Sequence, residues 1–284
     1  MKKNFRTDLA LEAHKLSQSD GEDIDGVIVR TEKDGDISIS HLEITNKQGS
    51  DALGKGIGKY ITIEYPDLKY STDNIEHICS LISNEIRSMS NISNDSTTLV
   101  VGLGNRAITP DALGTEVVER LLVTNHFKKH MENELTENLS SVCAIAPGVL
   151  GTTGMESSEI IKSITEMLKP DLVIVIDALA AAGIEHVAST VQISNAGIQP
   201  GAGVGNNRDG INKETLGIDV IAIGVPTVID AQNIAEIPEN ISPLMVTTTD
   251  IDTVIKQCAK TIAGGINTAL HKDMTFEKIM ELTA

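Results

Sequence analysis

Alternating apolar and polar residues predict antiparallel strands near the beginning of the chain. Residues 26–32 and 36–44 alternate in this way around a glycine-containing turn at 33–35. Two such runs on either side of a short turn are typical of a β-hairpin. A further alternating run at 60–64 predicts another strand. We therefore expect an antiparallel N-terminal addition to the main sheet.

Beyond residue 73 the pattern changes to strands that alternate with helices. Apolar residues at helical spacing predict a helix over 73–89, and unbroken β-branched runs predict strands that are buried on both faces. The expected strands cover 98–102, 142–146, 172–177, 187–193 and 220–225, and further helices are expected near 110–123, 156–168 and 248–263. This alternation implies an α/β fold with a mostly parallel central sheet covered by helices, in one domain.

Composition argues against several classes of function. The 284 residues include 40 Asp and Glu against 23 Lys and Arg, a formal charge of −17. Because this charge repels nucleic-acid backbones and anionic membranes, we expect no direct nucleic-acid partner and no membrane partner. No segment approaches the roughly 18 apolar residues of a membrane span, and the first residues lack the apolar stretch of a signal peptide. A cytoplasmic location is expected.

The three cysteines also point to an intracellular protein. Cys79, Cys143 and Cys258 are odd in number and widely spaced. This pattern predicts free thiols in a reducing compartment, with structural rather than catalytic roles.

Two aspartates are the strongest candidates for chemistry. Asp177 directly follows the apolar run 172–176, and burying a carboxylate there costs several kcal/mol unless it is paired, hydrogen-bonded or functional. Asp111 follows a glycine-rich turn and the helix-start sequence Thr109-Pro110. In open α/β sheets ligands bind at the carboxyl ends of the strands, so the two aspartates suggest acid–base chemistry there. Asp111 has a second interpretation, since an acidic residue in a first helical turn also stabilises the helix.

A nucleotide-binding function is a weaker alternative. The run Gly102-Leu103-Gly104-Asn105-Arg106-Ala107 matches the G-x-G-x-x-A fingerprint after a strand. However, Thr109 and Pro110 predict a helix that starts about five residues too late to bind a phosphate, and 122–126 contains no acidic ribose ligand.

Several blocks of sequence together resemble the germination protease family of spore-forming bacteria. They occur in order at Gly102–Asn105, Thr109–Gly114, Pro147–Gly154, Ile176–Ala180, Pro200–Asn206, Thr215–Ile218 and Ile221–Ala231. The resemblance implies an endopeptidase that cleaves small acid-soluble spore proteins during germination, in the developing spore and spore core. It also implies a homotetramer and a three-layer α/β/α fold similar to hydrogenase-maturation peptidases. Its catalytic pair would be Asp111 and Asp177, as in an atypical aspartic peptidase that needs no cofactor.

The resemblance further implies a zymogen that processes itself. Members of the family cut substrates after Glu in sequences like Thr-Glu-Ile/Phe-Ala-Ser-Glu, and Thr7–Glu12 resembles that site with Asp8 and Leu9 at the cut. We therefore predict a propeptide at 1–8, a single protease domain at 9–284 and self-cleavage between Asp8 and Leu9. From the residues alone, the segment from Asp8 is equally compatible with the start of a short helix.

A mechanism follows as a hypothesis. One ionised carboxylate takes a proton from water while the other, protonated, polarises the scissile carbonyl, because two neighbouring carboxylates do not easily ionise together. Asp111 is expected to be the ionised member because of the helix start. Oxyanion donors are expected in the peptide N–H groups of 102–105 or 151–154.

One alternative and one departure from the family pattern stay open. Related maturation peptidases hold a metal with two carboxylates and a histidine, which makes His186 a candidate third ligand in a metal-dependent peptidase. The chain also has Ala182-Gly183 and His186 at positions where basic residues are usual in the family. This departure affects the expected substrate docking, oligomer contacts or zymogen regulation, and it leaves an inactive or altered paralogue as an alternative.

Overall fold

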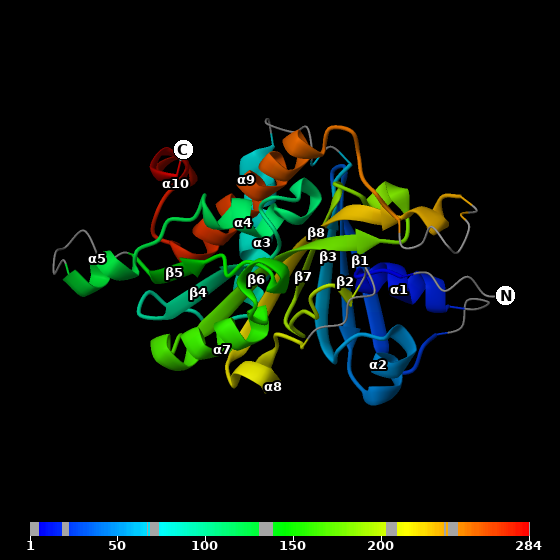
Figure 1. The fold of residues 1–284 in the computed structure, drawn as a ribbon, viewed down its shortest axis with the longest axis horizontal. Helices are drawn as coiled ribbons and strands as arrows, with labels where there is room; N and C mark the ends of the chain where they lie inside the picture. The colour runs from blue at the N-terminus through cyan, green and yellow to red at the C-terminus, as the bar shows by residue number, and fades with distance from the viewer. Residues whose placement is uncertain are drawn as a thin grey trace.

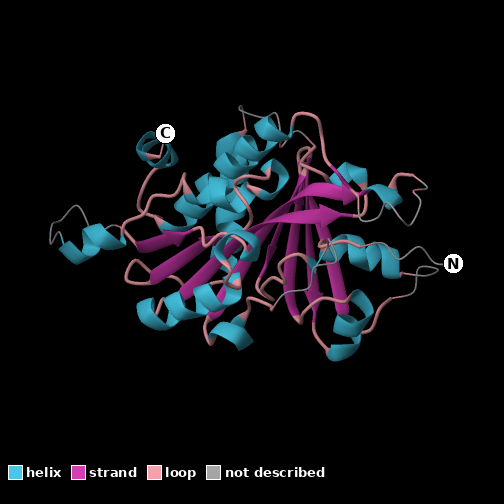
Figure 2. Cartoon of the chain, viewed as in Figure 1, coloured by secondary structure: helices cyan, strands magenta, loops and turns pink. Residues whose placement is uncertain are grey.

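One mixed β-sheet organises the protein (Figures 1 and 2). The computed structural model describes residues 6–18, 23–66, 68, 74–130, 139–202, 209–235, 237 and 244–283. The strand order is β1-β2-β3-β7-β8-β6-β4-β5, and β9 pairs with β8. The strands are β1 (Val27–Asp34), β2 (Ile37–Ile44), β3 (Gly58–Glu64), β4 (Thr97–Gly102), β5 (Ser141–Ile145), β6 (Leu172–Ala181), β7 (Thr190–Ser194), β8 (Asp219–Asp230) and β9 (Met245–Val246).

Helices connect these strands and cover them. The α-helices are α1 (Ala10–Ser17), α2 (Lys47–Leu53), α3 (Ile75–Ser88), α4 (Leu113–Val118), α5 (Asn125–His130), α6 (Leu150–Thr153), α7 (Ser157–Leu168), α8 (Lys213–Leu216), α9 (Ile251–Leu270) and α10 (Phe276–Leu282). Single turns of 3-10 helix occur at η1 (Thr109–Asp111), η3 (Ile184–His186) and η5 (Ala231–Asn233). Within the described part of the chain, no helix is both long and apolar enough to span a bilayer.

The sheet has a parallel and an antiparallel half. Strands β5, β4, β6 and β8 pair in parallel, whereas β7, β3, β2 and β1 continue the sheet through antiparallel pairs. The predicted α/β class, with a parallel centre and an antiparallel N-terminal addition, is therefore confirmed. The predicted hairpin is also present, because Asp34 pairs with Ile37 across the turn that contains Gly35.

Apolar contacts on both faces explain the unbroken β-branched runs. Val173 and Val175 of β6 pack with α7 and α8 in one cluster, while Ile174 and Ile176 pack with α3, α4 and α9 in another. Figures 1 and 2 show these two helix groups on opposite faces of the sheet. Successive side chains of a strand point to opposite faces, so a strand covered on both sides must be apolar at every position.

Several boundaries differ from the sequence-based expectations. β6 continues to Ala181 because it goes on pairing with β8 after β4 ends, and β8 continues to Asp230, where β9 pairs with it. The helix expected over 110–123 is wrong as one unit, since it is divided into η1 and the short α4. The helix expected over 248–263 instead runs as α9 to Leu270, with Cys258 and Ile262 among its buried residues.

The glycines of the fingerprint-like run serve close packing. Gly104 has a φ of 102°, and a Cβ there would lie 1.9 Å from the Asp111 carbonyl oxygen. A Cβ on Gly102 would lie 2.0 Å from the carbonyl oxygen of Gly114. These contacts press the loop after β4 against η1 and α4, which leaves the nucleotide-binding alternative without the open glycine turn on which it depends.

Replacing Gly114 by alanine should lower the free energy of unfolding by about 2 kcal/mol or more. The new Cβ would lie 2.4 Å from the Leu103 carbonyl oxygen and 2.7 Å from that of Ile176, and neither backbone atom can move aside cheaply. Chemical denaturation measures the change. Gly151→Ala in α6 is the matched control, because its Cβ meets nothing within 4 Å. Equal destabilisation by the two substitutions would contradict the packing role.

Candidate active site

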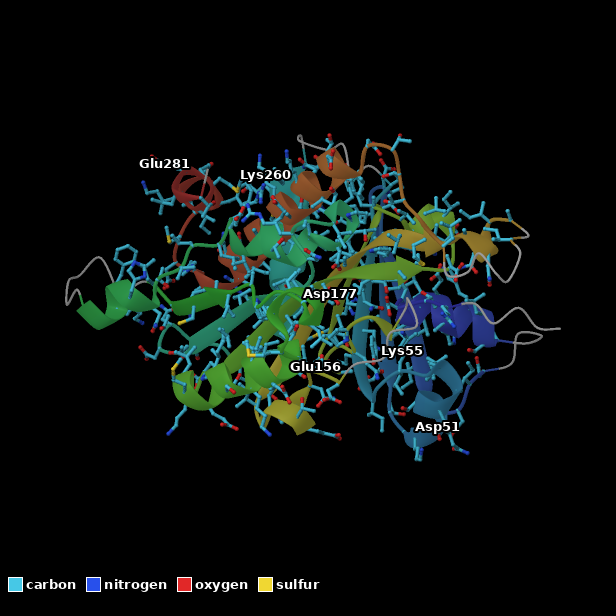
Figure 3. All side chains as sticks on the ribbon, in the orientation of Figure 1. Asp51, Lys55, Glu156, Asp177, Lys260 and Glu281 are labelled. Atoms are coloured by element: carbon cyan, nitrogen blue, oxygen red, sulfur yellow. The ribbon has the colours of Figure 1, made fainter. Side chains whose placement is uncertain are left out.

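Asp177 lies within the central strand rather than at its end. It is 7% exposed, and it pairs with Gly224 of β8. The neighbouring Ala178 N–H donates to Asp177 Oδ1 at 3.0 Å. β4 stops pairing with β6 at Ile176, so Asp177 is the first residue beyond the doubly paired part of β6. Figure 3 labels Asp177 near the middle of the molecule.

Asp111 lies on η1 rather than in the first turn of an α-helix. The helix start expected at Thr109-Pro110 is only this single turn, which Ile108 precedes and no side chain caps. Instead, the Asn105 N–H donates to Asp111 Oδ2 at 2.8 Å. The anion of Asp111 is therefore favoured by a directed backbone hydrogen bond rather than by the dipole of a long helix.

A bulge in β8 joins the two aspartate-bearing segments. Leu179 pairs with Pro226 but Ala180 pairs with Val228, which leaves Thr227 as the extra residue. The Thr227 hydroxyl donates to the Pro110 carbonyl oxygen at 2.7 Å. Bulges commonly re-aim side chains next to functional sites, and this bulge fixes η1 against the sheet.

Both aspartates line one cavity of about 510 Å³. Most of its other side chains are apolar and come from the loops after β4 and β5, from β6, β8 and β9, and from the loop after β7. They include Leu103, Ile108, Pro110, Val149, Leu179, Pro200, Val228 and Met245. The structure therefore brings together the two residues that the sequence marked separately. A third carboxylate, Asp8, also lines this cavity.

The N-terminal segment, residues 7–12, binds along β6 through Asp8. The Asp8 N–H donates to the Ala180 carbonyl oxygen, and the Ala180 N–H donates to Asp8 Oδ2, both at 2.8 Å. The Asp8 carbonyl accepts from Gln192 Nε2 at 3.1 Å, while Gln192 Oε1 accepts from the Ala10 N–H at 2.7 Å. Leu9 between them is 1% exposed. The predicted cleavage site therefore borders the cavity of both aspartates through Asp8.

Lys55 supplies a cation to the same segment. Its Nζ donates to the Thr7 carbonyl oxygen at 2.9 Å, and it lines a neighbouring cavity of about 340 Å³ together with Asp8. Burial lowers the pKa of Lys55, and the charges of Asp8 and Glu12 oppose this change. Figure 3 labels Lys55 on the side of the antiparallel strands.

Glu12 is anchored at the end of β6. Its carboxylate accepts from the Ala182 N–H at 2.8 Å and from the Gly183 N–H at 2.5 Å. The Thr7 hydroxyl also donates to Glu12. His186 Nε2 lies 3.8 Å from Glu12 Oε1, so this buried carboxylate has several partners.

His186 belongs to this acidic group rather than to the lining of the aspartate cavity. Its Nδ1 lies 3.3 Å from Glu64 Oε1 of β3 and 3.4 Å from the Thr190 hydroxyl of β7. Its Nε2 lies 3.9 Å from Glu185 of its own turn. The expectation that His186 joins Asp111 and Asp177 as a third metal ligand therefore finds no support in this geometry. Across the described ranges, no group of three or more His, Cys, Asp or Glu residues is arranged to hold a metal.

Two of the three cysteines show no sign of nucleophilic activation. None of the three forms a disulfide bond. Burial raises the pKa of Cys79 to about 12 and that of Cys258 to about 12, which keeps both thiols protonated near neutral pH.

Sequence reasoning missed two of the residues that hold the segment. Gln192 is a polar residue, 8% exposed, between the buried Val191 and Ile193 of β7, and a polar side chain at such a position is a usable signal. Lys55 lies in the glycine-rich loop after α2, and nothing in the surrounding sequence distinguishes it from an ordinary surface lysine. Only the folded chain shows that it reaches Thr7.

Sequence comparison places the chain among peptidases. It matches the germination protease family over residues 6–241. It is 41% identical to the germination protease of Clostridium tetani (strain Massachusetts / E88), over 97% of this chain and 98% of that protein. It is 46% identical to the germination protease of Geobacillus sp. (strain WCH70), over 81% of this chain and 65% of that protein. The chain belongs to the germination protease family.

One solved structure is similar in part. The [NiFe] hydrogenase maturation protease HycI from Thermococcus kodakarensis KOD1 is 21% identical, with a TM-score of 0.38 over 63% of this chain and 94% of that chain. A similarity of this size does not relate the sites of the two proteins.

The stability of the folded chain should decrease as the pH rises above neutrality, and His186 should cause part of this decrease. Its pKa is raised, chiefly by the hydrogen bond to Glu64 and also by the charges of Glu12, Glu64 and Glu185, while burial lowers it. The stabilisation is therefore complete below the unfolded-state pKa of about 6.5 and is lost as the pH rises through the folded-state pKa.

The test compares melting temperatures from about pH 6 to pH 9, a range that spans the titration of a histidine. His186→Gln should flatten the decrease with rising pH, whereas His41→Gln on the partly exposed face of β2 should leave it unchanged. Identical pH profiles for the wild type and His186→Gln would show that this cluster does not contribute.

Proposed function

We propose that this chain is an endopeptidase zymogen that cuts itself between Asp8 and Leu9 and then initiates the degradation of small acid-soluble spore proteins. The observation that carries the proposal is that Asp8 lines the same cavity as Asp111 and Asp177. Membership of the germination protease family supports the peptidase activity. Residues 1–8 are then the propeptide, of which residues 1–5 lie outside the described part of the chain, and residues 9–284 are the protease domain.

The proposed mechanism uses the two aspartates in different protonation states. Asp111 is partly exposed and accepts the Asn105 N–H, which favours its anion and suits it to take a proton from the attacking water. Asp177 is the more deeply buried of the two, which suits it to the role of the acid. The water oxygen bonds to the Asp8 carbonyl carbon, the Asp8–Leu9 bond breaks, and a proton passes to the departing Leu9 nitrogen.

Gln192 is the proposed electrophilic donor to the scissile carbonyl. Its Nε2 already donates to the Asp8 carbonyl oxygen, and such a donor stabilises the charge that develops on this oxygen. The turn over 102–105 was one expected source of oxyanion donors. Its Asn105 N–H instead binds Asp111.

The remaining features of the proposal come from the family. We propose that the mature form assembles as a homotetramer in the developing spore, with acid-soluble spore proteins as its macromolecular substrates. No cofactor enters the proposed reaction, because the water, both proton carriers and the carbonyl donor are drawn from solvent and this chain.

Intact mass after incubation of the purified full chain tests the central step. The wild type should lose Met1 to Asp8, whereas Asp111→Asn and Asp177→Asn should stay intact, with rates lowered at least about a hundredfold because a proton carrier is removed. Asp51→Asn on the exposed surface of α2 is the matched control and should be processed normally. A chelator should not change the rate.

Circular dichroism and melting temperature establish that each variant is folded. If the wild type were neither processed nor able to cut a peptide copying residues 5–17, the peptidase proposal would be wrong. If both asparagine variants were processed like the wild type, the proposed roles of the aspartates would be wrong, but the proposed peptidase activity would still be supported.

A further inference from the structure

The open edge of β6 is where the chain binds its own N-terminal segment. β4 pairs with β6 only as far as Ile176, but β6 continues along β8 to Ala181. Beyond Ile176, no strand in the described part of the chain pairs with β6 on the side away from β8. Asp8 occupies this edge through its paired hydrogen bonds with Ala180. Exposed strand edges are common templates for binding an extended peptide.

The Asp8 and Glu12 carboxylates of the segment accept hydrogen bonds from consecutive outward-facing N–H groups on this edge. Alternate residues of a strand present their N–H groups to the same side, and here Ala180 and Ala182 both donate to the segment. The first donates to Asp8 and the second, together with Gly183, donates to Glu12. Charge-assisted hydrogen bonds of this kind are stronger and more selective than neutral ones.

A basic side chain accompanies each carboxylate. Lys55 lies at the Asp8 end, where it also binds the Thr7 carbonyl oxygen. His186 lies at the Glu12 end and is held between Glu12 and Glu64. The Glu12 carboxylate reaches the N–H groups of both Ala182 and Gly183 directly.

The spacing of these donors limits the conformation of a bound peptide. Residues 180 and 182–183 of an extended strand lie about 7–10 Å apart at roughly 3.3 Å per residue. Four residues of a fully extended peptide span about 13 Å, whereas four residues of a helix span about 6 Å. In this chain Leu9 is extended and α1 begins at Ala10, so Glu12 lies close enough to reach the second pair of donors.

We propose that the open edge of β6 forms two acid-binding subsites, which select a substrate by the spacing of two acidic residues. The first, made by Ala180 and Lys55, binds the acidic residue before the cleaved bond. The second, made by Ala182, Gly183 and His186, binds an acidic residue four positions later, on a segment that turns helical directly after the cut. This proposal rests on the proposed peptidase function and assigns the residues that select the substrate of that site.

The first test measures self-processing of the full chain by intact mass. Glu12→Gln and Lys55→Met should each slow the loss of Met1 to Asp8 by about tenfold or more, because a charged hydrogen-bonding partner is lost. Lys55→Arg should restore most of the rate. Glu43→Gln and Lys47→Met, at exposed positions on β2 and α2, are the matched controls and should be processed like the wild type.

The second test uses peptides in trans with the processed wild-type chain. A peptide copying residues 5–17 should be cut between its Asp8 and Leu9 equivalents. Moving the later glutamate one position in either direction, or replacing the equivalent of Ala13 with proline, should lower kcat/KM by about tenfold or more, because the carboxylate misses its donors or the helix breaks. The same peptide with a conservative change at position 16 should be cut normally.

The outcomes separate this proposal from the proposed function. Cleavage of the wild type at Asp8–Leu9 with equal rates for Glu12→Gln, Lys55→Met and the shifted peptides would overturn the subsites and leave the peptidase intact. Cleavage at another bond would overturn the subsites as well, because Asp8 would no longer be the residue before the cut. Absence of any cleavage, in cis or in trans, would overturn the peptidase and the subsites together.

Discussion

The structure depends on one mismatch in length between neighbouring strands. Among the described strands, β6 pairs with both β4 and β8 up to Ile176 and with β8 alone beyond it. A buried backbone must still satisfy its N–H and C=O groups, so the freed edge requires other partners. The N-terminal segment supplies them at Ala180 and Ala182. The same change in pairing places Asp177 in the lining of a cavity instead of in a closed sheet.

The second aspartate depends on loop packing. Gly104 and Gly114 allow the chain after β4 to fold tightly against η1, and the bulged Thr227 ties Pro110 to β8. Asp111 is therefore positioned by close backbone packing within its own loop and by one hydrogen bond to the neighbouring Pro110 from a residue more than a hundred positions away. Such support keeps a carboxylate in one orientation, which acid–base chemistry requires.

The sequence predicted the sheet well because each strand is marked by residues within the strand itself. Unbroken β-branched runs mark the strands buried on both faces, and the alternating runs mark the hairpin. It predicted both aspartates from their positions after glycine and apolar runs. It placed Asp177 at the end of its strand and Asp111 in a long α-helix instead of a single 3-10 turn, because pairing with β8 and packing around Gly104 are set by tertiary contacts. Lys55 and Gln192 could not be assigned to the segment, since their partners Thr7 and Asp8 lie 48 and 184 residues away in the sequence.

The burial of Leu9 has a consequence for the mature enzyme. Cleavage before Leu9 would release the short peptide that Asp8 anchors, but Leu9 is 1% exposed and α1 stays attached to the domain. The new end of the chain would then occupy the second half of the binding edge at a high effective concentration. A substrate could bind there only in the fraction of molecules whose α1 start has detached, so its apparent affinity would be reduced by that fraction. The resting activity of the processed protein would thus be set by a local opening equilibrium as well as by the chemistry of the aspartates.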